Sequence, residues 1–183
     1  MGLFGRPEPK LGTENSDAMD TAWKIHGAVV DWTGKVDAKA AFAFTLESAA
    51  LATMIALSGE GRVFGYLDGP VQNITYFVAA ALLLLSAASA LLVVTPRLRL
   101  FKVKKEWPEN FIYFGHLKSW DPARLGSKIQ ETDMLPVLTK QLVTMSKICW
   151  NKHQWVAISF ILAALAGVSL LVCALLVRAG LPL

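Results

Sequence analysis

Residues 74–94 read ITYFVAAALLLLSAASALLVV, and this stretch decides the fold class. It lies inside a longer run, residues 69–96, that contains no charged residue. A second uncharged run, QWVAISFILAALAGVSLLVCALLV, covers residues 154–177. Each run exceeds the roughly 20 residues that a helix needs to cross a hydrocarbon core about 30 Å thick. Both are therefore predicted to span a membrane, in a chain that is 54% hydrophobic over 183 residues.

Residues 40–58 form a weaker third stretch that is apolar and rich in alanine. A helix lying in the membrane interface is the alternative, but such helices carry a strongly polar face, which this stretch lacks. We therefore predict a first membrane span here. Glu47 lies inside it, and two interpretations stay open. An intramembrane carboxylate usually faces the bundle interior or water and is a functional candidate, or Glu47 reaches the headgroups at the inner boundary.

The distribution of Lys and Arg predicts the orientation. Residues 95–154 carry eleven Lys and Arg against five Asp and Glu, whereas residues 59–70 carry only Arg62 as a basic residue. The positive-inside rule then places the N-terminus and residues 95–154 in the cytoplasm, with the 59–70 loop and the C-terminus outside. The basic run 97–105 is interpreted as a topology determinant, and no nucleic-acid partner is expected.

Helical packing positions recur along two segments. A seam with spacing 4-3-4-4-3 begins at residue 25 and continues to Met54, which predicts one helix from the cytoplasm into the first span. Its members are Ile25, Val29, Trp32, Val36, Ala40, Ala43, Glu47, Ala50 and Met54. A similar stripe before the last span consists of Leu138, Leu142, Met145 and Cys149, with no helix breaker after it.

Between the second and third spans the sequence predicts a small mixed module. Residues 97–103 and 111–114 are rich in β-formers and flank a turn at residues 107–110, which predicts a hairpin. Asp121 followed by Pro122 predicts the start of a helix that ends near Glu131.

The expected fold class is a mainly α integral membrane protein, with three transmembrane helices and a small cytoplasmic α+β module of a short hairpin plus helices. The expected segments are a disordered tail at 1–15, a cytoplasmic helix at 16–39, span one at 40–58, an external loop at 59–70, span two at 71–95, the basic module at 96–153, span three at 154–178 and an external tail at 179–183.

Signs of catalysis are missing from the sequence. No H-x-x-x-H pair, nucleophile elbow or P-loop is present, and the two cysteines form no C-x-x-C pair. We therefore expect no enzyme, no catalytic residues, no metal and no cofactor. A nucleotide pocket is the remaining chemical candidate, since aromatic faces stack on a base and an arginine binds phosphate. The residues of that type are Asn110, Tyr113, His116, Trp120 and Arg124. The alternative is that the aromatic residues are core and that Arg124 is a solvated first-turn residue.

The string NFIYFGH at residues 110–116, followed by SWDP at 119–122, resembles the transmembrane effector family of Pycsar antiphage systems. The DAKA string at 37–40 and the residues Gln141, Ser146 and Lys152 before the last span agree with this resemblance, which covers most of the chain. It implies a bacterial inner-membrane effector, encoded beside a pyrimidine cyclase and switched on by a cyclic pyrimidine nucleotide, cUMP or cCMP. The activated protein would then impair the membrane and cause abortive infection.

The family motif does not place the nucleotide, so its assignment to the five residues above is our own hypothesis. A homo-oligomer is expected, with small-residue faces at Ala163 and Gly167 and at Ser86 and Ala90 where subunits could associate. The alternative function is a constitutive small channel or an accessory membrane subunit, with Glu47 lining a path.

Overall fold

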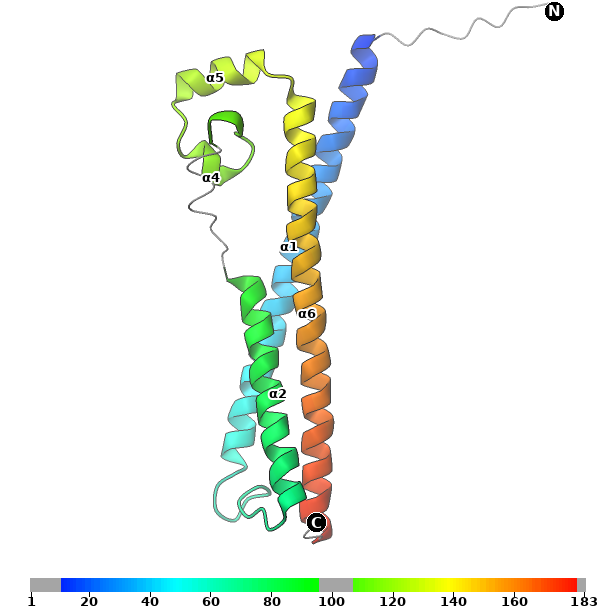
Figure 1. The fold of residues 1–183 in the computed structure, drawn as a ribbon, viewed down its shortest axis with the longest axis vertical. Coiled ribbons are helices and arrows are strands. Elements are labelled where there is room, and N and C mark those ends of the chain that lie inside the picture. The colour runs from blue at the N-terminus through cyan, green and yellow to red at the C-terminus, as the bar shows by residue number, and fades with distance from the viewer. Residues whose placement is uncertain (1–10, 96–106, 181–183) are drawn as a thin grey trace, which may run out of the picture. The chain divides into compact units, whose positions relative to one another are not determined.

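The computed structural model describes residues 11–95 and 107–180, with side chains described from residue 15 onward. This part of the chain is helical and contains no strand (Figure 1). Its elements, in order, are α1 (Leu11–Ala56), α2 (Pro70–Val94), the 3₁₀ helix η1 (Trp107–Glu109), α4 (Phe114–Leu117), α5 (Pro122–Glu131) and α6 (Met134–Ala179).

The ends of α2 and α5 follow from local sequence chemistry. α2 begins at Pro70, whose ring fixes a helical φ, and ends at Val94, just before Thr95 and a second proline. α5 begins at Pro122, and the Asp121 side chain accepts hydrogen bonds from the backbone N–H groups of Ala123 and Arg124, at 3.1 Å each. The predicted N-cap at Asp121 and the predicted helix end near Glu131 are both confirmed.

α1 and α6 are each unbroken helices of 46 residues. At a rise of 1.5 Å per residue each is about 70 Å long, more than twice the thickness of a hydrocarbon core. α1 begins at Leu11, so residues 11–15 are helical and the expected tail at 1–15 is too long; residues 1–10 lie outside the described part.

The chain divides into two compact units, which we call the module and the bundle. The module comprises Met1–Trp32 and Arg97–Cys149, and the bundle comprises Thr33–Pro96 and Trp150–Leu183. Both α1 and α6 contribute residues to each unit. In the bundle, α1, α2 and α6 pack around two apolar clusters. The first consists of Val36, Ala40, Val93 and Val156, and the second of Met54, Leu83 and Ala166.

The buried positions of α1 follow a strict 4-3 heptad repeat. Val36, Ala40, Ala43, Glu47 and Met54 are buried in the bundle, as the predicted seam requires, and Val29 is buried in the module. The prediction is wrong for Ile25 and Trp32, whose exposed fractions are 46% and 54%. The half-buried residues His26 and Thr33 occupy the repeat instead, each one position later. The predicted seam is therefore off by one residue at these two positions, because a polar side chain occupies the packing position and an apolar one precedes it.

α6 continues its predicted stripe into the bundle. Leu138, Leu142 and Cys149 are buried and Met145 is half-buried, which confirms the stripe. Buried positions then recur with heptad spacing at Val156, Ser159, Ala166 and Cys173. Heptad spacing on both long helices is the pattern that keeps one face of a helix against its neighbours over many turns.

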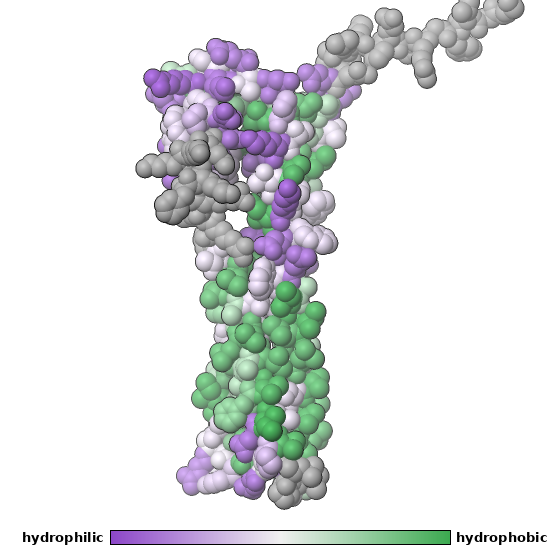
Figure 2. All heavy atoms as spheres, in the orientation of Figure 1, coloured by the Kyte–Doolittle hydropathy of each residue, from purple (hydrophilic) through white to green (hydrophobic). Residues whose placement is uncertain are grey.

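The outward face of the bundle is apolar. Large side chains such as Phe42, Ile55, Phe77, Leu84 and Ile161 are more than half exposed. Figure 2 shows this hydrophobic surface on the visible face of the bundle, with hydrophilic residues at the end that carries the loop between α1 and α2. Three helices of the described chain are long and apolar enough to cross a membrane, and they lie at Asn15–Ala56, Pro70–Val94 and Met134–Ala179. The prediction of three such helices is confirmed.

The predicted hairpin is wrong in the part that the structure describes. Residues 111–113 form no strand, and Phe114 begins α4. The turn at 107–110 exists as the 3₁₀ helix η1, closed by a hydrogen bond of 3.2 Å from Asn110 N–H to the Trp107 carbonyl. The other expected strand, at 97–103, lies outside the described residues. Phe111 is buried and meets the Trp120 ring, Tyr113 meets the Phe114 ring, and Ile112 packs on a cluster of Ala22, Leu138 and Leu142. This packing overrides their strand propensity.

Candidate functional site

A polar layer crosses the interior of the bundle. Glu47 of α1 is 4% exposed, and Ser86 of α2 and Ser159 of α6 are fully buried. Ser86 Oγ lies 2.5 Å from Glu47 Oε1 and 2.6 Å from the Ser159 carbonyl oxygen. Ser159 Oγ lies 2.6 Å from the same Glu47 Oε1. Each of the three long helices thus contributes one polar side chain to a single hydrogen-bonded cluster.

Heptad register brings these three residues together. Glu47 lies seven residues after Ala40, and Ser159 lies three residues after Val156 and seven before Ala166. The apolar cluster around Ala40 therefore covers the layer on one side, and the cluster around Ala166 covers it on the other. Water is excluded from both directions, which raises the strength of every hydrogen bond in the layer and the cost of any unmade one.

The sequence left two interpretations of Glu47 open, one facing the bundle interior and one reaching the headgroups, and in the structure Glu47 faces the interior. Its carboxyl group contacts Ser86 and Ser159 and does not extend to the boundary of the span. Its second oxygen, Oε2, is buried and has no hydrogen-bond partner among the residues that the structure describes.

Glu47 was predicted from the sequence as a functional candidate, whereas its contacts with Ser86 and Ser159 were not predicted. Ser86 and Ala90, expected on a face for subunit association, are instead fully buried within the chain.

An ion pair joins α1 to α6 within the bundle. Lys152 Nζ lies 2.5 Å and 2.8 Å from the two carboxylate oxygens of Asp37. The two side chains are 22% and 37% exposed, so solvent reaches the pair. Lys152 occupies the heptad position between Cys149 and Val156, where an apolar residue would be expected in a simple coiled coil. A charge at a packing position fixes the pairing of the two helices more specifically than an apolar residue would.

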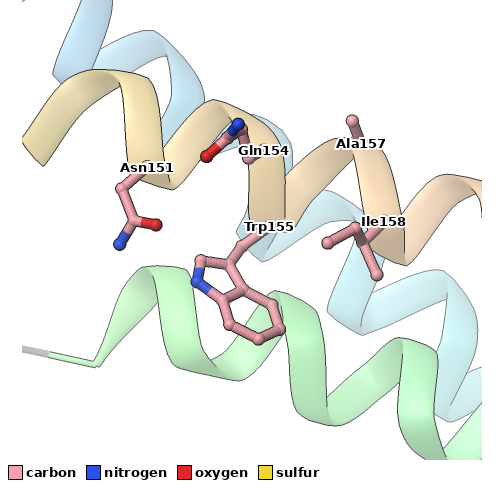
Figure 3. Close-up of a pocket in the computed structure, with 5 residues that line it drawn as sticks. All are labelled: Asn151, Gln154, Trp155, Ala157 and Ile158. Carbon is pink, nitrogen blue, oxygen red and sulfur yellow. The ribbon is translucent and has the colours of Figure 1, made fainter. Parts of the chain in front are cut away.

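A hollow on the surface of α6 lies beside this ion pair in sequence. It is lined by Asn151, Gln154, Trp155, Ala157 and Ile158 (Figure 3). All five belong to α6, and Figure 3 shows the Trp155 ring extending towards α2. The Trp155 ring packs against the apolar cluster that contains Ala40 and Val93, which makes it partly a core residue. We assign no ligand to this hollow.

In the module, the aromatic residues of the predicted nucleotide cluster pack on one another. The Trp120 indole N–H donates to the Asn110 carbonyl at 3.3 Å. The Trp120 ring meets the rings of Trp107 and Phe111 edge-on, at centroid distances of 5.3 and 6.4 Å. Trp120 is therefore a structural centre of this segment, which agrees with the core interpretation of that residue.

Tyr113 and His116 form a second pair, with ring centroids 5.4 Å apart, and His116 is buried. Gly115 permits this arrangement, since a Cβ at that position would lie 2.3 Å from a Tyr113 ring carbon. Arg124 belongs to neither pair. It is exposed on the first turn of α5, where its backbone N–H bonds to Asp121.

The structure thus joins Asn110 to Trp120 and Tyr113 to His116, and leaves the Arg124 side chain open to solvent. Tyr113 and Trp120 are half-buried, so part of each ring is accessible, and an exposed guanidinium can bind a phosphate. No group of three His, Cys, Asp or Glu residues in the described part of the chain is arranged to hold a metal ion.

Comparison with known protein families gives a match. A family model described as the Pycsar effector protein domain matches residues 21–179. No curated protein and no solved structure matches the chain. The match covers nearly the whole chain, from residue 21 within α1 to the end of α6.

Proposed function

The chain belongs to the Pycsar effector family and is a membrane protein, and on this basis we propose that it is an antiphage effector switched on by a cyclic pyrimidine mononucleotide. The signal is cUMP or cCMP, and the response is impairment of the inner membrane that leads to abortive infection. The observation that carries this proposal is the extent of the family match, because residues 21–179 include the apolar part of all three helices and most of the described module. The protein acts by binding and conformational change, and not as an enzyme.

In this proposal the protein lies in the inner membrane with its N-terminus in the cytoplasm and its C-terminus outside. The excess of Lys and Arg in residues 95–154 supports that orientation. It places the module on the side of the membrane where a cyclase would release its product. The loop between α1 and α2, with Arg62 as its one basic residue, then lies outside.

The nucleotide is proposed to bind in the module at Asn110, Tyr113, His116, Trp120 and Arg124. The accessible parts of the half-buried Tyr113 and Trp120 rings supply stacking for the base, and the exposed Arg124 supplies a charge for the cyclic phosphate. Among the five, Arg124 is the residue whose side chain serves no evident packing role. It is therefore the residue whose replacement separates binding from folding.

Binding in the module is proposed to reach the bundle through α1 and α6, which are continuous helices with residues in both units. A ligand shifts such an equilibrium only by its differential affinity for the two states. Several copies are proposed to associate through the outer face of α6. Gly167 supports this, because it is exposed and a Cβ there would meet nothing within 4 Å.

The alternative, a constitutive channel with Glu47 lining a path, loses its main support. Glu47 is 4% exposed and contacts Ser86 and Ser159, so it lines no open path among the described residues of one chain.

Co-expression in bacteria tests the proposal. The protein is produced together with a cyclase that makes cUMP or cCMP, or with a catalytically inactive variant of that cyclase, and membrane potential is followed with a dye. We expect depolarisation with the active cyclase alone. Equal depolarisation with both cyclases would contradict nucleotide control.

A further inference from the structure

The polar layer of the bundle contains more short oxygen–oxygen contacts than its two serine hydroxyls can supply with hydrogens. Three oxygen–oxygen contacts of 2.5, 2.6 and 2.6 Å join Glu47 Oε1, Ser86 Oγ, Ser159 Oγ and the Ser159 carbonyl. Distances this short occur between oxygen atoms that share a hydrogen. A fourth approach, 3.4 Å between the two serine hydroxyls, is too long to require one.

Two serines supply only two hydrogens for these three contacts, because each hydroxyl is a single donor. If Glu47 were a carboxylate, both hydroxyls would donate to Oε1. Ser86 Oγ and the Ser159 carbonyl, two acceptors, would then face each other at 2.6 Å with no hydrogen between them. A third hydrogen removes this conflict, and the carboxyl group is the remaining group in the layer that can carry it.

We propose that the centre of the bundle is a proton-binding site, in which Glu47 is a neutral carboxylic acid. Its Oε1–H donates to Ser86 Oγ, Ser86 O–H donates to the Ser159 carbonyl, and Ser159 O–H donates to Glu47 Oε1. Each short contact then has one hydrogen. The ligand is a hydrated proton from the solvent. Its binding converts the carboxylate into a carboxylic acid, and the Ser86 O–H turns from Glu47 Oε1 to the Ser159 carbonyl.

The unpartnered oxygen supports the same assignment. Oε2 is buried without a partner among the described residues, and a neutral carbonyl oxygen tolerates this far better than half of a carboxylate does. Within the described residues, no opposite charge contacts the Glu47 carboxyl group. Ser86 from α2 and Ser159 from α6 are not ionisable. The Asp37–Lys152 ion pair lies ten residues away on α1, about 15 Å at the helical rise.

Infrared spectroscopy tests the proposal directly. The purified full-length protein is measured in an ester-free detergent after exchange into D2O, so that lipid esters do not overlap the carboxylic-acid C=O band. We expect such a band in the wild type, a shift of it on labelling glutamate with ¹³C, and its loss in Glu47→Gln. Glu60→Gln, which changes an exposed loop glutamate, serves as the control and keeps the band.

Ser86→Ala gives a second measurement that does not depend on removing Glu47. The carboxyl hydrogen loses its acceptor in this variant, so the same band is expected to move to higher frequency while remaining sensitive to ¹³C-glutamate. Absence of any ¹³C-glutamate-sensitive acid band in the folded wild type would overturn the proposal. A band that persists unchanged in Glu47→Gln would also overturn it. Neither result bears on nucleotide control, so the two proposals fail separately.

Discussion

Lys152 and Asp37 show what a single polar pair does in the bundle. The pair is bidentate, at 2.5 and 2.8 Å, and joins α6 to α1 at a heptad position. Because both side chains are partly exposed, solvent screens the attraction, and the net contribution to stability is about 1 kcal/mol or less. Its greater effect is on specificity, since a wrong register of the two helices leaves Lys152 facing apolar residues.

Lys152→Asp is therefore predicted to lower the apparent Tm of the purified protein, because two carboxylates then face each other. The swap Asp37→Lys with Lys152→Asp restores the attraction and is predicted to recover most of the loss. Circular dichroism in detergent provides the measurement. A double variant as unstable as the sum of the two single variants would show that the pair is not coupled.

Arg124 carries the prediction for the nucleotide site. Its guanidinium is exposed, so Arg124→Ala removes a charge without opening a cavity. A hydrogen bond to a charged group is worth about 1.5–3 kcal/mol, which corresponds to a roughly 10- to 100-fold loss of affinity for cUMP or cCMP. Equilibrium binding to the purified protein measures it.

Lys118→Ala is the matched control, because Lys118 is also an exposed basic residue of the module. Its affinity is predicted to stay within about twofold of the wild type. Equal losses in the two variants would mean that general positive charge, and not Arg124, attracts the nucleotide. Trp120→Ala is a poorer test, since Trp120 contacts Trp107 and Phe111 and its loss disturbs the fold of the segment.

Residue-scale prediction from sequence succeeded for Glu47 and failed for its partners. A carboxylate in an apolar span stands out because burying it is costly. Ser86 and Ser159 do not stand out, since serine is common in such helices and bonds equally well to its own backbone, as Ser89 does to the Leu85 carbonyl at 2.8 Å. Only the three-dimensional register separates a serine that bridges helices from one that does not.

At the scale of the helices, neighbouring alanines of α1 have opposite environments. Ala40 is fully buried in the apolar cluster with Val36, Val93 and Val156, whereas Ala41 is exposed. Ala40→Leu forces extra methylene groups into a packed site and is predicted to destabilise the bundle by about 1–3 kcal/mol. Ala41→Leu makes the same chemical change outside the core and is predicted to change stability by about 0.5 kcal/mol or less.

Thermal unfolding of the two variants in the same detergent checks this prediction. Both substitutions add equal apolar volume and have similar helix propensity, so the difference between them reports packing alone. A similar loss of stability in both variants would contradict the assigned seam.

The long helices were predictable because their signals are periodic and repeated over many turns. The module was not, and its error has a physical cause. Phe111 and Tyr113 have high strand propensity, but no partner strand pairs with them in the described residues, and they pack instead against aromatic neighbours within the same short segment. Local propensity cannot anticipate such packing. The cap at Asp121 was predictable because its hydrogen bonds are made within three residues.

At the scale of the whole molecule, α1 and α6 unite two different surfaces in one chain. Their bundle portions present large apolar side chains outward, and their module portions belong to a unit that contains the candidate nucleotide residues. This division is what an effector needs if one unit detects a soluble signal and the other acts on the bilayer. The family membership and the three apolar helices agree with such a division of roles.

Dye release from liposomes tests the central claim most directly. The purified protein is reconstituted at a fixed protein-to-lipid ratio, and cUMP, cCMP, cAMP and cGMP are added separately. The account predicts that cUMP or cCMP triggers release, that the purine nucleotides do not, and that Arg124→Ala shifts the response to higher nucleotide concentration while Lys118→Ala does not. Equal release without any nucleotide, or no release with any of the four, would contradict it.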